Sequence, residues 1–148
     1  MFILLLPIYS SNQNIEQPYA LVSSAEERPS PSNWIKEDQI KVYKDKIVIE
    51  LKNAEWAKFT DTNSMDPILD ENTNAIEIVP QSYDDVSEGD IVSYSIPNVQ
   101  GIIIHRIFET GFDKNGWYAI TKGDNIETKD PYKVRFENIK RVVVAVIY

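Results

Sequence analysis

The chain has no cysteine and only one histidine among its 148 residues. Without cysteine it can form neither a disulfide framework nor a thiolate metal site, and its redox compartment stays undetermined. Zinc sites are built from several cysteine, histidine or carboxylate ligands, most often with histidine or cysteine among them. A single histidine therefore argues against a zinc centre, and we expect no metal and no cofactor.

Basic residues are in the minority, with 15 lysines and arginines against 23 aspartates and glutamates and a net charge of −8. Proteins that bind nucleic acid normally present a basic surface. The charge balance thus argues against a nucleic-acid partner, and it says nothing about a substrate. A hydrophobic content of 43% is enough for a packed core, so the composition fits one globular domain with an appendage.

A long apolar run is missing as well. Residues 2–9 (FILLLPIY) are apolar, but a membrane-spanning helix needs about 20 such residues. The first positive charge is Arg28, so the segment also lacks the basic region of a regular signal peptide. It can be the end of a spanning helix whose start is missing, a degenerate signal segment or a disordered terminus.

The rest of the chain divides into a linker and a β-rich part. Residues 10–31 are polar and contain several prolines, which is typical of an extended linker, so we place a domain boundary between 1–33 and 34–148. Residues 40–51 surround Lys44-Asp45 and predict a β-hairpin. No stretch keeps a helical apolar period, and short β-branched or aromatic runs predict a mainly antiparallel sheet or barrel, with strands at 57–62, 75–79, 91–96, 102–109, 117–121 and 142–148.

Three residue types in this chain predict acyl-transfer chemistry. Ser64 stands before Met-Asp-Pro, and a serine hydroxyl needs a positioned base to become a nucleophile. His105 is the natural candidate for that base because imidazole exchanges protons near neutral pH. Asp124 and Asp130 follow and can orient an imidazole, in a chain order that a catalytic triad allows. Each residue alone also fits an ordinary role, as a turn serine, a core histidine or a loop carboxylate.

Four short motifs also resemble, in their order, those of type I signal peptidases: SMDP at 64–67, GDIV at 89–92, HRI at 105–107, and KGDN at 122–125 followed by Asp130. The resemblance covers about residues 56–148. The histidine is similar to the base of the archaeal and endoplasmic-reticulum branch, since the usual bacterial branch and LexA-type repressors use a lysine. The chain departs from the family pattern at Ile68, where threonine is more usual, and at Ile126, where a second asparagine is usual.

The resemblance implies the β-rich catalytic domain of the signal peptidase/LexA-like type and a Ser-His-Asp serine endopeptidase. It implies that Asp130 and Asp124 both belong to the active site, and we favour Asp130 as the direct partner of His105 with Asp124 supporting the loop. It also makes the Thr62 hydroxyl a candidate oxyanion donor; the alternative is a threonine that only serves a strand.

The implied substrates are the signal peptides of translocated preproteins, cleaved through an acyl-enzyme. The enzyme would be membrane-associated with its catalytic domain on the extracytoplasmic side, and residues 2–9 would be the remainder of a truncated membrane anchor. Additional subunits are an open question. The alternatives are a related serine peptidase with another target, including self-cleavage, and a non-catalytic β-domain that binds peptides.

Overall fold

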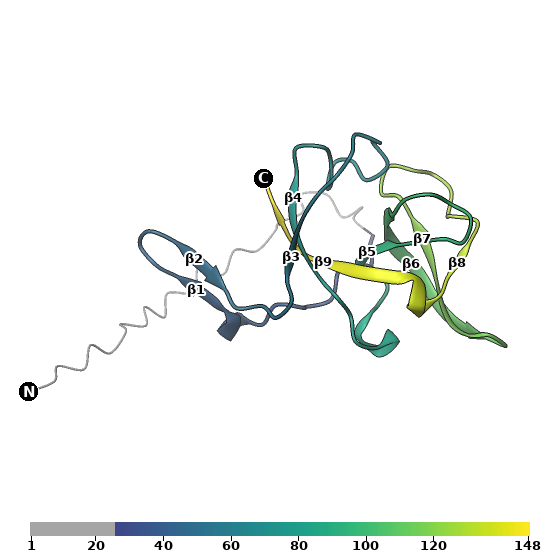
Figure 1. Cartoon of the computed structure of the whole chain (residues 1–148), viewed down its shortest axis with the longest axis horizontal. Helices are drawn as coiled ribbons and strands as arrows, with labels where there is room; N and C mark the ends of the chain where they lie inside the picture. Colours follow the sequence, from purple (N-terminus) through teal and green to yellow (C-terminus); the bar gives the residue numbers. More distant parts are fainter. Residues whose placement is uncertain (1–25) are drawn as a thin grey trace, which may run out of the picture.

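The computed structural model describes residues 26–148, and the anchor predicted at residues 2–9 lies outside this part. The protein is mainly β, with a curled seven-stranded antiparallel sheet that forms a half-barrel (Figure 1). Residues 26–148 contain no α-helix, only 3-10 turns at Glu37–Gln39, Tyr83–Asp85 and Phe136–Asn138. No helix in this part of the chain is long and apolar enough to cross a membrane.

The strands follow one another closely along the chain. They are β1 (Ile40–Val42), β2 (Ile47–Ile49), β3 (Glu55–Lys58), β4 (Asn74–Ile78), β5 (Ile91–Tyr94), β6 (Ile103–Asp113), β7 (Gly116–Lys122), β8 (Lys133–Val134) and β9 (Ile139–Ile147). The main sheet has the order β3-β4-β9-β5-β6-β7-β8, and each neighbouring pair is antiparallel. The C-terminal strand β9 therefore lies between β4 and β5, in the middle of the sheet.

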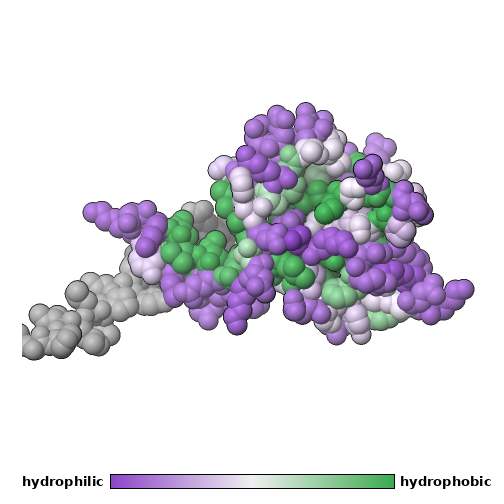
Figure 2. All heavy atoms as spheres, in the orientation of Figure 1, coloured by the Kyte–Doolittle hydropathy of each residue, from purple (hydrophilic) through white to green (hydrophobic). Residues whose placement is uncertain are grey.

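The predicted hairpin at 40–51 is confirmed, because β1 pairs with β2 in an antiparallel register. Its Ile40–Ile49 and Val42–Ile47 pairs share one face, and all four side chains are exposed. Figure 2 shows apolar side chains gathered over β1 and β2.

The predicted strand at 57–62 is wrong at both ends. β3 begins at Glu55 and already ends at Lys58, which pairs with Asn74, the first residue of β4. Residues 59–62 therefore have no partner strand beside them, and Thr62 lies in the loop that follows. Other boundaries also differ: β6 continues to Asp113, β9 begins at Ile139, and the short β8 was not predicted.

The central strand β5 is buried along its whole length, in keeping with its mostly apolar sequence, in which Ser93 is the polar exception. On one face of β5, Val92 and Tyr94 belong to a hydrophobic cluster that includes Ile107 of β6. On the other face, Ile91 belongs to a second cluster, with Met65, Leu69, Ala75 and Val143. The second cluster is the important one for the site, because it holds the loop after Ser64 against the sheet.

Asp90, just before β5, is fully buried. It binds the segment of the chain that precedes the β1–β2 hairpin. Its carboxylate accepts hydrogen bonds from the backbone N–H of Ser32 at 2.7 Å, the indole N–H of Trp34 at 3.1 Å and the backbone N–H of Ser87 at 2.9 Å. The domain boundary placed after residue 33 stays a prediction, and the close contacts extend back to Pro29, whose backbone lies against Gly89.

Candidate active site

Ser64 lies in the loop between β3 and β4, directly after Asn63, whose backbone is left-handed with φ of 55°. Asparagine tolerates this conformation better than most residues. The next residue, Met65, is 2% exposed, and its carbonyl accepts the backbone N–H of Ile68 at 2.9 Å and of Leu69 at 3.1 Å. The buried Met65 side chain and this tight turn hold Ser64 in a defined position at the surface.

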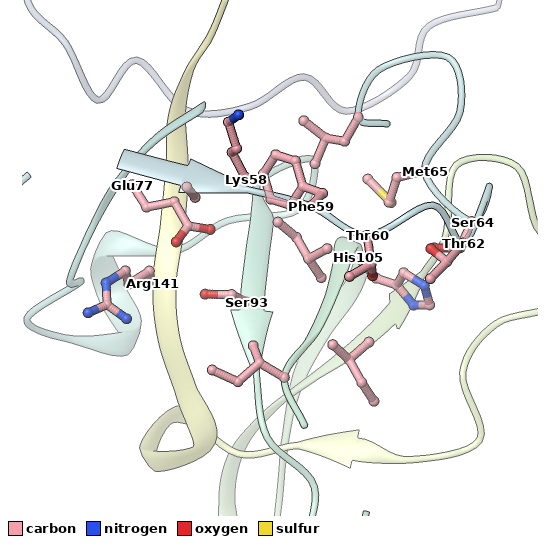
Figure 3. Close-up of a pocket in the computed structure, with 15 residues that line it drawn as sticks. Lys58, Phe59, Thr60, Thr62, Ser64, Met65, Glu77, Ser93, His105 and Arg141 are labelled. Carbon is pink, nitrogen blue, oxygen red and sulfur yellow. The ribbon is translucent and has the colours of Figure 1, made fainter. Parts of the chain in front are cut away.

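Ser64 opens onto a cleft of about 490 Å³ whose walls come from residues 57–60, the Ser64 loop, the start of β6 and β9. In Figure 3 the side chains of Ser64, Thr62 and His105 lie together at one end of this cleft. The hydroxyl oxygens of Thr62 and Ser64 are 3.2 Å apart. Thr62 is thus placed beside the nucleophile candidate by the loop, and not by a strand.

His105 lies on β6 and is held by Asp130. Its Nδ1 is 2.7 Å from Oδ2 of Asp130, and the residue is 8% exposed. Asp130 is itself fixed, because its backbone N–H donates to the carbonyl of Thr121 at 2.8 Å. With Nδ1–H donating to the carboxylate, a neutral imidazole keeps Nε2 as its proton acceptor.

The same oxygen of Asp130 accepts two further hydrogen bonds, from the hydroxyl of Thr121 at 2.7 Å and the hydroxyl of Tyr94 at 2.9 Å. Burial raises the pKa of the Tyr94 hydroxyl well above its usual range, so this group stays protonated as a donor. Three donors therefore converge on one carboxylate oxygen, which fixes the orientation of the carboxylate and of the imidazole.

Asp124 forms an ion pair with Arg106 and does not contact His105. Its carboxylate accepts from Nε and Nη2 of Arg106 at 2.8 and 2.7 Å, and Nη1 of Arg106 donates to the carbonyl of Gly89 at 2.7 Å. Because neighbouring residues of a strand point to opposite faces, this ion pair lies on the other face of β6 from His105. Asp124 thus joins the loop after β7 to the start of the β5 segment.

The loop after β7 also holds the Ser64 backbone in place. Asn125 donates its backbone N–H to the carbonyl of Ser64 at 3.0 Å and its side-chain amide to the carbonyl of Asn63 at 2.9 Å. A Cβ at Gly123 would lie 2.6 Å from the Ser64 carbonyl oxygen and 3.1 Å from Nε2 of His105. Glycine is therefore needed where the serine loop and the imidazole approach each other.

Three residues of the site had no role assigned from the sequence, namely Tyr94, Thr121 and Asn125. Asn125 belongs to the KGDN motif, and that position is the one signal that pointed to it. Tyr94 and Thr121 look like ordinary strand residues, and only the strand pairing places them beside Asp130.

The two departures from the family pattern have local roles. The backbone N–H of Ile126 donates to the carbonyl of Gly123 at 3.1 Å, so the loop closes without a second asparagine. Ile68 packs against the cluster beneath the Ser64 loop, and its carbonyl accepts from the Tyr148 hydroxyl at 2.8 Å. Neither side chain lines the cleft.

Comparison of the chain with protein-family models, with curated proteins and with solved structures finds no match. Within residues 26–148, no group of three or more histidine, aspartate or glutamate side chains is arranged to hold a metal ion. A function must therefore be inferred from the site itself. A serine hydroxyl, an imidazole and a partly buried carboxylate at the end of an open cleft can perform acyl transfer.

Proposed function

We propose that this protein is a serine endopeptidase of the type I signal peptidase kind, in the archaeal and endoplasmic-reticulum branch, with the catalytic domain of the signal peptidase/LexA-like type. The single observation that carries the proposal is the convergence at one end of the cleft. There Ser64 lies beside Thr62, and His105 is hydrogen-bonded to Asp130 at 2.7 Å.

In this mechanism the Oγ of Ser64 attacks the carbonyl carbon of the scissile peptide bond while its proton passes to Nε2 of His105. The backbone N–H of Ser64 and the hydroxyl of Thr62 stabilise the oxyanion of the tetrahedral intermediate. His105 then protonates the leaving amine, and an acyl-enzyme remains on Ser64. Water, deprotonated by the same imidazole, hydrolyses it, while Asp130 orients the ring and stabilises its charged form.

The shape of the cleft supports a peptide substrate. β3 is an edge strand of the main sheet, and its last residues, Ala57 and Lys58, line the cleft. An extended peptide can pair with the free backbone groups of such an edge, with its alternate side chains directed into the cleft. Small residues beside the scissile bond would agree with the A-x-A-like rule for signal peptides.

The proposed localisation is a membrane, with the catalytic domain on the extracytoplasmic side and preprotein signal peptides as partners. This part of the proposal depends on the resemblance and on residues 1–25, which lie outside the described structure.

The decisive experiment replaces the nucleophile candidate. The wild type should react with a serine-directed fluorophosphonate probe and cleave a detergent-solubilised preprotein, and Ser64→Ala should do neither while it keeps its melting temperature. Ser95→Ala, a serine outside the cleft, is the matched control and should behave like the wild type. Undiminished cleavage by Ser64→Ala would exclude the mechanism, and peptide binding without any cleavage by the wild type would favour a non-catalytic binding domain.

A further inference from the structure

The cleft has a second polar end, away from the nucleophile candidate. Glu77 on β4 is 7% exposed and lines the cleft, and in Figure 3 it lies with Arg141 on the opposite side from Ser64 and His105. Among residues 26–148, no group forms a hydrogen bond or an ion pair with the Glu77 carboxylate. Neither Glu77 oxygen is fully enclosed, so the carboxylate stays in contact with the water of the cleft and is open to a ligand there.

The neighbouring charges leave Glu77 uncompensated. Glu55 lies directly opposite Glu77 in the register of β3 and β4, and like charges in that position repel each other. Arg141 on β9 lies near both, but its Nη2 pairs with Glu55 at 2.6 Å. One guanidinium between two carboxylates leaves a net negative charge, and the partner of the guanidinium is the exposed carboxylate, not the buried one.

The remaining polar groups of the cleft are consistent with an acceptor site. Ser93 on β5 is 5% exposed and lines the cleft, and its hydroxyl has no hydrogen-bond partner within the described residues. Lys58 also lines the cleft, but its ammonium group lies over the Trp56 ring, 5.3 Å from the ring centroid. In Figure 3 the Lys58 side chain points away from Glu77. The cleft therefore offers a carboxylate and a hydroxyl that no cation pairs with, although Arg141, whose Nε is buried without a partner, lines the cleft as well.

We propose that Glu77 is the specificity-determining residue of a subsite that accepts a lysine or arginine side chain of the bound peptide, with the Ser93 hydroxyl beside it. A cationic side chain would supply the missing charge and a charge-assisted hydrogen bond. Its aliphatic stem would pack on the apolar walls formed by Phe59, Ile103 and Ile104. This inference rests on the proposed function, because it assumes an extended peptide in the cleft that ends at Ser64.

The test measures peptide binding to the full chain carrying Ser64→Ala, so that cleavage does not interfere. Fluorescent neutral peptides of one length carry a single lysine, moved along the sequence, and are compared with peptides carrying glutamine or glutamate at the same position. Lysine at one position should tighten binding by about tenfold or more, as expected for a hydrogen bond to a charged group, and glutamate there should weaken it.

Two variants assign the effect to its residue. Glu77→Gln keeps the shape of the side chain and should abolish the lysine preference. Glu71→Gln is the matched control, because Glu71 is an exposed carboxylate outside the cleft, and it should retain the preference. Equal affinity for lysine, glutamine and glutamate peptides at every position would overturn the subsite, and this comparison needs no Glu77 variant. A lysine preference that persists in Glu77→Gln would overturn it too.

Cleavage by the enzyme with Ser64 intact separates this inference from the proposed function. Ser64-dependent cleavage without any preference for a basic side chain would overturn the subsite and leave the peptidase proposal standing. A Glu77-dependent lysine preference in binding, without cleavage of any of these peptides or of a preprotein, would support the subsite and contradict the peptidase.

Discussion

The carboxylate of Asp124 faces the guanidinium of Arg106, with Nε–Oδ1 and Nη2–Oδ2 distances of 2.8 and 2.7 Å. Asp130, six positions further along the chain, instead faces His105. The two aspartates thus serve opposite faces of β6. This separation lets their effects on stability and on catalysis be measured independently.

Asp124→Asn should lower the free energy of unfolding by about 1–3 kcal/mol, because the partly buried Arg106 loses its charged partner. Activity should fall much less than stability. Urea unfolding of Asp124→Asn, Arg106→Gln and the double variant checks this, since the second change should cost little once the first has been made. Additive losses would show that the two side chains are not coupled.

Asp130→Asn should leave the fold intact and lower kcat by about 10⁴-fold, the effect that the same change has in a serine-protease triad. The amide can favour the wrong imidazole tautomer, while the hydroxyls of Thr121 and Tyr94 can rotate to suit it. Rates and melting temperatures of both aspartate variants decide the assignment. A large rate loss in Asp124→Asn, beside a nearly active Asp130→Asn, would exchange the two roles.

Thr62→Val should lower kcat by about 10²–10³-fold with little change in KM, because it removes one oxyanion donor and keeps the shape of the side chain. Thr62→Ser keeps the hydroxyl and is the matched control, so it should retain most of the activity. Steady-state kinetics on a fluorogenic peptide provide the measurement. Equal rates for the valine and serine variants would remove Thr62 from the mechanism.

Gly123→Ala should lower kcat/KM by about 100-fold, because its Cβ would displace the Ser64 backbone or the His105 ring by a fraction of an ångström to an ångström. The melting temperature should change only modestly. Gly111→Ala is a suitable control, since the Cβ there meets the flexible Tyr118 side chain at 2.7 Å, away from the site. Full activity in Gly123→Ala would mean that the loop has room to spare.

Glu77→Gln should make the protein more stable at neutral pH. Burial raises the pKa of Glu77 above its ordinary value of 4.5, Arg141 opposes the shift, and Glu55 adds to it. A raised pKa in the folded state means that this group's stabilising contribution is complete below about pH 4.5 and is lost as the pH rises through the raised value. The glutamine variant should therefore melt a few degrees higher at pH 7, and the difference should shrink toward pH 4. If the difference in melting temperature between the variant and the wild type were the same from pH 4 to pH 7, the pKa of Glu77 would not be raised.

Local patterns were sufficient to predict most of the sheet. The Ile40–Val42 and Ile47–Ile49 strands are rich in β-branched residues on both sides of a turn, and β5 is mostly apolar because both of its faces are covered. The end of β3 could not be predicted, since it depends on where β4 begins in space. β8 has only two residues, Lys133 and Val134, too few for any periodicity to appear.

The candidate site was predictable where chemistry requires particular residue types, and less so where geometry decides. Ser64 and His105 stand out as a serine before a turn and the one histidine of the chain. Arg106 pairs with Asp124 because of the register of β6 and β7, which places Arg106 opposite Lys122, two positions before Asp124. Glu77 gave no signal, because a glutamate in a strand usually faces solvent, and only the curl of the sheet encloses it.

Asp90 has a mechanical consequence for the chain that precedes the sheet. Its hydrogen bonds to Ser32 and Trp34 join that segment to the start of β5, which lies between β6 and β9. A pulling force applied before Ser32 would therefore be transmitted to the middle of the sheet, and the β1–β2 hairpin would bear no load until the bonds at Asp90 break. The distance between Ser32 and Ser64 is therefore set by folded structure and not by a slack tether.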